Sequence, residues 1–224
     1  MIVVHHLNNS RSQRVLWLLE ELGLPYEITR YERDPETMLA PLSLRRVHPL
    51  GKSPVITEGP LTLAESGAII DYVTARYGDG RLVPAAGTPE RLLYTYWLHY
   101  AEGSTMPPLL LKLIFDRIET APMPFFVRPV AKMIARRAKR SFIEPQIDLH
   151  LDYIEGELGK RAWFAGSDFT AADIQMSYPL EAAAARAGLG ASRPRLQTFL
   201  ERIHARPAYE RALKKGGPYA LLTR

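Results

Sequence analysis

The sequence contains no cysteine. Structural disulfides, a metal site built on cysteine and a redox-active protein thiol are therefore excluded, and any thiol chemistry needs a thiol that arrives with a ligand. No apolar run approaches the roughly 20 residues that cross a membrane. The first residues lack the basic region ahead of an apolar stretch that marks a secretory signal, so we expect a cytoplasmic protein without a membrane partner.

The chain also lacks the Arg-Gly repeats and the aromatic-basic interleaving that are typical of nucleic-acid binding. The net charge is +5, and much of the excess lies between Arg128 and Arg140, where the cations have no acidic neighbour. Such a run could attract nucleic acid or anionic lipid, but we expect a solvated helix face and no nucleic-acid partner. The 224 residues are 46% hydrophobic and 24% charged, which suits one large or two modest soluble domains.

The first third of the chain has the spacing of alternating strands and helices. Residues 2–7 and 26–31 are predicted strands, and the helix between them is predicted to open with a capping box from Ser10 to Gln13. Gly23 ends that helix. A strand–helix–strand unit of this length fits a parallel pair with a crossover helix.

Residues 48–66 combine a turn, two short apolar runs and an acidic-hydroxyl pair. Ser53 precedes Pro54, which favours an extended backbone able to offer an N–H and a C=O to a peptide. Glu65 and Ser66 stand where a helix begins, and a hydroxyl with free N–H groups there suits a carboxylate. With a neighbouring lysine, the stretch suits a small acidic peptide. The alternative is a tight hairpin followed by Ser66 as a helix cap.

Glycine and proline gather in residues 78–89, which indicates a linker. Beyond it only helical spacing occurs, with a break at 121–124. We therefore expect a mixed domain over residues 1–80, a linker at 81–89 and an all-helical domain over 90–224.

A second capping box is predicted near the end of the chain. Thr170 is the expected cap, Asp173 its reciprocal partner, and Phe169 is expected to pack on Ile174 as a hydrophobic staple. We expect these residues to be structural rather than catalytic.

Four motifs occur in a fixed order, namely residues 10–14 at a helix start, 51–54 before a strand, 65–67 at another helix start, and 169–173. Together, and over essentially the whole chain, they resemble the glutathione transferases. The segments His-Pro-Leu-Gly-Lys-Ser-Pro, Leu-Ala-Glu-Ser-Gly and Tyr-Ala-Glu-Gly-Ser look most like the Gtt-type branch of fungi and bacteria. The resemblance implies an α/β thioredoxin-like first domain of order βαβαββα, followed by an all-α domain.

The resemblance also implies glutathione as co-substrate, with no metal. The implied glutathione-binding residues are His48, Lys52, Ser53, Pro54, Glu65 and Ser66. Ser53 would pair by its backbone with the cysteinyl part, beside a cis Pro54. Glu65 and Ser66 would hold the γ-glutamyl ammonium and carboxylate, and the remaining two would face the glycyl carboxylate.

Classes of this family differ in using Tyr, Ser or Cys after the first strand, and neither Tyr nor Cys occurs in residues 1–25. The resemblance therefore implies Ser10 as the catalytic residue. A hydroxyl that donates to sulfur favours the thiolate. Lowering the thiol pKa by about 2 units needs about 2.7 kcal/mol, and one hydrogen bond to a charged partner supplies roughly 1.5–3 kcal/mol. The alternatives are that Ser10 only caps the helix, or that Asn8, Asn9 or Ser12 contacts the thiol.

The implied reaction adds the glutathione thiolate to apolar electrophiles, as in detoxification. Tyr96, Tyr100 and Met106 could line the electrophile pocket, with core packing as the alternative. The family usually forms twofold-symmetric dimers, so we expect a homodimer. Two other hypotheses are glutathione-dependent peroxide reduction at the same site, and a non-catalytic protein of this fold that binds a partner through residues 128–140.

Overall fold

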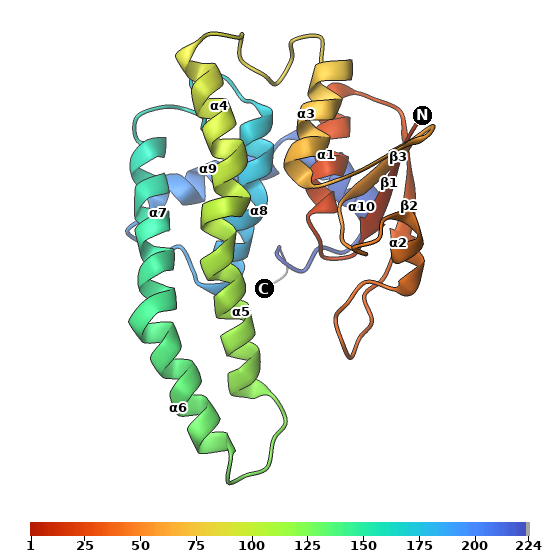
Figure 1. Ribbon diagram of the computed structural model, residues 1–224. Coiled ribbons are helices and arrows are strands. Elements are labelled where there is room, and N and C mark those ends of the chain that lie inside the picture. The colour runs from red at the N-terminus through yellow and green to blue at the C-terminus, as the bar shows by residue number, and fades with distance from the viewer. Residues whose placement is uncertain (223–224) are drawn as a thin grey trace.

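The computed structural model describes residues 1–222 and consists of a small sheet flanked by helices, joined to a larger set of helices (Figure 1). The elements of the first part are β1 (Ile2–Leu7), α1 (Ser12–Leu22), β2 (Tyr26–Tyr31), α2 (Leu42–Val47), β3 (Val55–Glu58), β4 (Leu61–Ala64) and α3 (Ser66–Tyr77). This is the predicted βαβαββα order of a thioredoxin-like domain.

The four-stranded sheet has the order β2-β1-β3-β4. β1 runs parallel to β2 and antiparallel to β3, as the crossover helix between the first two strands requires. β3 and β4 form a hairpin in which Glu58 pairs with Leu61, and Gly59 supplies the positive φ of the turn, +55°.

α1 begins later than the sequence predicts, and its predicted capping box is wrong. Ser12 is the first helical residue, and no side-chain capping bond is made. The Ser10 hydroxyl instead accepts from the Ser12 N–H at 3.2 Å and contacts the hydroxyls of Ser12 and Ser53. The Gln13 side-chain nitrogen is buried without a partner in the described residues. At the other end, Gly23 adopts φ +66° and closes the helix, as predicted.

Among the residues that the structure describes, every regular element of the second part is a helix, as predicted. Its elements are α4 (Pro89–Tyr100), η1 (Ala101–Thr105), α5 (Met106–Thr120), α6 (Arg128–Ala138), η2 (Lys139–Ile143), α7 (Glu144–Leu158), α8 (Ala171–Arg186), α9 (Pro194–His204) and α10 (Pro207–Gly216). The π-helical turns η1 and η2 join α4 to α5 and α6 to α7, which makes two long helices side by side (Figure 1). No regular element lies between α3 and α4; the boundaries at residues 80 and 90 stay a prediction.

The predicted capping box of α8 is confirmed. The Asp173 carboxylate is fully buried and accepts from the Thr170 N–H at 2.8 Å and the Phe164 N–H at 2.9 Å. Phe169 packs against the rings of Trp17 and Trp163, with centroids 5.6 and 5.0 Å away. The cap therefore fixes α8 where it meets α1.

The basic run forms α6 and the first two residues of η2, and α6 lies in the helical part away from the sheet (Figure 1). Arg128, Arg137 and Arg140 are exposed, whereas Arg136 and Lys139 pair with Glu119 of α5. The run is thus an exposed helix face, and the choice between a solvated face and a partner surface stays a prediction. In the part of the chain that the structure describes, no helix is both long and apolar enough to cross a bilayer.

Candidate functional site

A pocket of about 210 Å³ lies where the first part of the chain faces η1. Its lining residues are Arg11, His48, Leu50, Lys52, Ser53, Pro54, Ala64, Glu65 and Glu102. The structure therefore brings together in one pocket the glutathione-binding residues that the resemblance implies between His48 and Glu65. It adds Arg11 from the start of α1 and Glu102 from η1, which the sequence analysis missed.

The loop before β3 supplies the pocket wall. The Ser53–Pro54 peptide bond is cis, as the resemblance implies. Pro54 is buried and Ser53 half-buried. The Ser53 hydroxyl lies 3.3 Å from the carbonyl oxygen of His5 and 3.2 Å from the Ser10 hydroxyl. The loop is thereby attached to the end of β1 and the start of α1.

Glu65 lies at the junction of β4 and α3 with φ +73°, a backbone region that non-glycine residues seldom occupy. Its side chain is exposed in the pocket wall. Backbone strain of this kind concentrates at binding and catalytic sites. The next residue, Ser66, is 3% exposed, and its hydroxyl accepts from the Arg14 guanidinium at 2.8 Å. Ser66 is thus the first residue of α3, not its cap.

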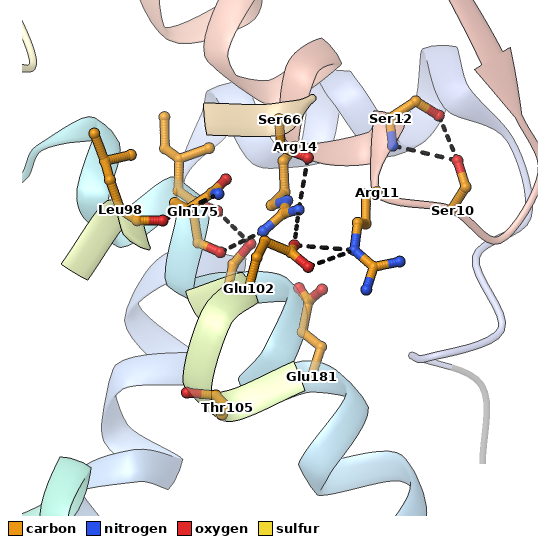
Figure 2. A network of polar contacts seen from close by, with 12 residues as sticks. Ser10, Arg11, Ser12, Arg14, Ser66, Leu98, Glu102, Thr105, Gln175 and Glu181 are labelled. Atoms are coloured by element: carbon orange, nitrogen blue, oxygen red, sulfur yellow. Dashed lines mark hydrogen bonds and ion pairs between the residues drawn. The ribbon is translucent and has the colours of Figure 1, made fainter. Parts of the chain in front are cut away.

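Arg14 links the two parts of the molecule behind the pocket (Figure 2). Its side chain is 1% exposed and donates to Ser66, to the Gln175 carbonyl at 2.6 Å and to Glu102 at 2.5 Å. Glu102 also accepts from Arg11 at 2.9 Å. Burial alone raises the pKa of Glu102, but the Arg14 and Arg11 guanidiniums outweigh it and hold that pKa below its ordinary value.

The pocket lining carries both charges. Arg11 and the exposed Lys52 are cationic, whereas Glu65 and Glu102 are anionic. Among residues 1–222, Lys52 forms no ion pair. The buried Nδ1 of His48 also has no hydrogen-bond partner there. Such a lining suits a ligand that carries both an ammonium and carboxylates.

Ser10 lies directly behind Ser53 and is 3% exposed. It does not line the pocket itself. The alternatives to it are engaged elsewhere: Asn8 accepts from the Arg33 N–H at 3.0 Å, and Asn9 accepts from the Ala220 N–H at 2.6 Å. Ser12 is fully buried. Of these four residues, Ser10 has the hydroxyl that contacts Ser53, at 3.2 Å.

Tyr96, Tyr100 and Met106 do not line this pocket. Tyr100 is buried, and its hydroxyl lies 2.5 Å from Nδ1 of His150 on α7. Tyr96 stacks on Tyr100 and is 41% exposed, while Met106 is buried in the core. Core packing, the alternative stated above, describes Tyr100 and Met106. Their assignment to an electrophile pocket stays a prediction.

Comparison with known proteins relates both parts of the chain to one family. Family models described as "Glutathione S-transferase, N-terminal domain" and "Glutathione S-transferase, C-terminal domain" match residues 10–76 and 122–207. Glutathione S-transferase 3 of Schizosaccharomyces pombe is 38% identical over 82% of this chain and 74% of its own. Glutathione S-transferase 1 of Saccharomyces cerevisiae is 32% identical over 96% of this chain and 95% of its own.

Solved structures agree with these matches. A glutathione S-transferase from Actinobacillus pleuropneumoniae is 32% identical and covers 100% of this chain and 97% of its own, with a TM-score of 0.80. A glutathione transferase homologue from Sulfitobacter, solved with bound glutathione, shares the fold at 22% identity and a TM-score of 0.73, over 96% of this chain and 98% of its own. The chain belongs to the glutathione S-transferase family.

Proposed function

We propose that this protein binds glutathione in the pocket beside the cis Pro54 loop, activates its thiol as a thiolate and adds it to apolar electrophiles. The observation that carries this proposal is the pocket itself. One wall is the Ser53–Pro54 loop, and another is the strained Glu65 ahead of α3. In this family, such a loop and such a helix start form the two ends of a glutathione site.

Each end of glutathione meets a group of suitable charge in this proposal. Glu65 pairs with the γ-glutamyl ammonium, and the N-terminus of α3 with the Ser66 hydroxyl receives its carboxylate. Ser53 offers its backbone to the cysteinyl part. Lys52 and His48, which both line the pocket, face the glycyl carboxylate. The mixed charge of the lining supports this orientation.

Ser10 is the proposed thiolate donor. Its hydroxyl lies 3.2 Å from the Ser53 hydroxyl, beside the place where the cysteinyl part would lie. The N–H groups at the start of α1 add a positive potential at the same place, worth about 0.3–1 kcal/mol for an anion. A hydroxyl hydrogen bond and a helix terminus together are sufficient for the thiol pKa shift of about 2 units considered above.

We further propose that the protein is a cytoplasmic homodimer that acts in detoxification, as expected from the sequence.

In the proposed reaction the thiolate attacks an electrophilic carbon and a carbon–sulfur bond forms. In a substitution, the leaving group departs with its electron pair. In an addition, the neighbouring atom takes a proton. No contact within residues 1–222 favours peroxide reduction or a non-catalytic role over this transfer.

Isothermal titration with glutathione tests the site. We expect micromolar-to-millimolar binding that competes with S-methylglutathione. Ser66→Ala should weaken binding about tenfold or more, because a hydrogen bond to a charged group is worth roughly 1.5–3 kcal/mol. Ser141→Ala, an exposed serine on η2, is the matched control and should bind normally. Absence of heat and of competition would overturn the proposal.

Thiolate absorbance of bound glutathione tests Ser10. Ser10→Ala should fold and bind glutathione, but the pKa of the bound thiol should rise by about 1–2 units, since a charge-assisted hydrogen bond is lost. An unchanged thiol pKa in this variant would assign thiolate stabilisation to another group.

A further inference from the structure

The α5–α6 hairpin projects from one end of the molecule (Figure 1), and none of its residues lines the pocket described above. At its tip, Phe125 is 86% exposed and Phe126 is 68% exposed. Their rings contact each other, with centroids 5.6 Å apart, and no further ring among residues 1–222. Two adjacent phenylalanines in water are unfavourable in proportion to their exposed apolar area, so the tip is a candidate contact surface.

α6 continues this apolar surface. Of its residues, only Ala135 is buried, whereas the larger side chains of Val130, Met133 and Ile134 are exposed. Val130 and Ile134 are four residues apart and therefore lie on the same side of the helix. In a helix that only covers a core, the large apolar side chains face inward. Here they lie where a partner, and not the core, would cover them.

The same segment carries charge of one sign. Residues 121–143 contain no Asp or Glu, and their cations are Arg128, Lys132, Arg136, Arg137, Lys139 and Arg140. A groove of about 700 Å³ runs along α6, and its lining residues are Pro129, Lys132, Met133, Arg136, Arg137, Arg140 and Ser141. Arg137 and Arg140 are exposed and form no ion pair within residues 1–222. The groove therefore places unneutralised cations directly beside exposed apolar side chains.

A bilayer with anionic headgroups matches both properties of this surface. Its phosphates attract the arginines and lysines, while the boundary between headgroups and acyl chains accepts phenylalanine, valine and methionine side chains. A twofold contact with a second copy would set two basic surfaces against each other, which is unfavourable at short distance. Nucleic acid would neutralise the cations but would leave the apolar side chains in water.

The place of the phenylalanines also suits a flat partner. They lie at the end of a projecting hairpin, so they can reach a plane before the rest of the molecule does (Figure 1). Contact of this kind needs no helix that spans a bilayer. The sequence alone predicts a solvated face without a membrane partner, because it shows the cations but not whether Val130 and Ile134 are buried.

We propose that residues 124–141, from the tip of the hairpin through the groove on α6, form a surface that docks on bilayers of anionic phospholipid. Phe125 and Phe126 enter the headgroup boundary, and the cations of the groove bind lipid phosphates. This docking does not depend on the proposed function. It would nevertheless place a transferase for apolar electrophiles beside the phase in which such compounds dissolve.

Co-sedimentation of the full chain with vesicles tests the proposal. We expect binding to vesicles of equal parts phosphatidylcholine and phosphatidylglycerol, weaker binding at high salt, and little binding to phosphatidylcholine alone. Phe125→Ser should weaken binding about tenfold, because a phenylalanine that enters the bilayer is lost. Arg137→Gln should weaken it about fivefold, as expected for one cation near an anionic surface.

Two exposed residues elsewhere supply matched controls. Leu42→Ser on α2 and Lys214→Gln on α10 remove an exposed leucine and an exposed cation, and both should bind vesicles like the unmodified chain. Circular dichroism and glutathione titration should be unchanged in all four variants, because none of the altered residues is buried or lines the pocket.

Three results would overturn the inference. The first is absence of binding to the mixed vesicles, or normal binding by Phe125→Ser. The second is a smaller mass of Phe125→Ser in sedimentation velocity without vesicle binding by the unmodified chain, which would assign the surface to a second copy. The third is binding to duplex DNA that Arg137→Gln weakens and Phe125→Ser does not, again without vesicle binding. Each leaves the proposed function standing, because glutathione titration tests that separately.

Discussion

At the scale of single residues, Glu65 combines an unfavourable backbone with a position in the pocket wall. A φ of +73° costs a non-glycine residue about 1–3 kcal/mol. Nothing in the folding of α3 needs a carboxylate there, because no side-chain capping bond is made. The strain is therefore understandable as the cost of presenting the side chain to a ligand.

Two substitutions separate the strain from the carboxylate. Glu65→Gly should raise the free energy of unfolding by about 1 kcal/mol, since glycine adopts this φ freely. Glu65→Ala keeps the strain and should not stabilise. Both should weaken glutathione binding about tenfold, because both remove the partner of the ammonium. Urea unfolding and isothermal titration measure the two effects; normal affinity in either variant would remove Glu65 from the site.

The sequence predicted the pocket residues that lie close together along the chain, and it missed those that fold brings from elsewhere. His48 to Glu65 form one local unit of loop and hairpin, so their proximity follows from turn chemistry and spacing. Arg11 and Glu102 meet only because the fold brings the side chain of a residue in η1 to the start of α1, 91 residues earlier in the sequence. Glu102 lies within the Tyr-Ala-Glu-Gly-Ser segment, but that pattern does not say which domain its carboxylate faces.

At the scale of elements, similar capping motifs had opposite outcomes at α1 and α8. The Thr170 cap forms because Asp173 reaches back to free backbone N–H groups. At Ser10 the hydroxyl is already engaged by Ser12 and Ser53, and the helix starts later. A local pattern identifies a helix start, but tertiary partners decide what the side chain does.

The α8 cap gives a prediction for stability. Asp173→Ala leaves the buried N–H groups of Phe164 and Thr170 without acceptors and should cost about 2–4 kcal/mol. Asp173→Asn retains one acceptor oxygen, so its free energy of unfolding should lie between those of Asp173→Ala and the unmodified chain. Asp168→Ala, at an exposed residue in the same loop, is the control and should change little. If the urea midpoints of all three variants equalled that of the unmodified chain within experimental error, the role assigned to this cap would be contradicted.

At the scale of the whole molecule, Arg14 and Glu102 tie the two parts together beside the ligand pocket. The pKa of Glu102 is lower in the folded chain than the ordinary glutamate value of 4.5. Its pairing with the arginines therefore stabilises the folded state at pH values above 4.5, and this stabilisation is lost as the pH falls below 4.5. The sequence places Arg14 at the start of a helix, yet nothing local shows that residue 175 accepts from it.

This pairing can be followed by unfolding in urea at several pH values. Glu102→Gln should be less stable than the unmodified chain at pH 7, and the difference should shrink as pH falls below 4.5, because the carboxylate then takes up a proton first in the unfolded chain and, at lower pH, in the folded one. Glu36→Gln, at an exposed glutamate, should track the unmodified chain. A Glu102→Gln difference that stays constant with pH would mean that the charge of Glu102 contributes nothing.

α1 has consequences for how the two parts depend on each other. It is buried from Ser12 through Glu20, with Trp17 in contact with Phe169 and with Tyr209 of α10. Part of the surroundings of α1 therefore comes from α8 and α10, beyond residue 160. When only the first eighty residues have left the ribosome, α1 lacks the partners that α8 and α10 later provide. Trp17 and leucine side chains of α1 are then still exposed to water. The thioredoxin-like part is therefore synthesised long before α10, the helix that covers one side of α1 in the folded chain. We expect it to reach its final packing only after α10 has been made.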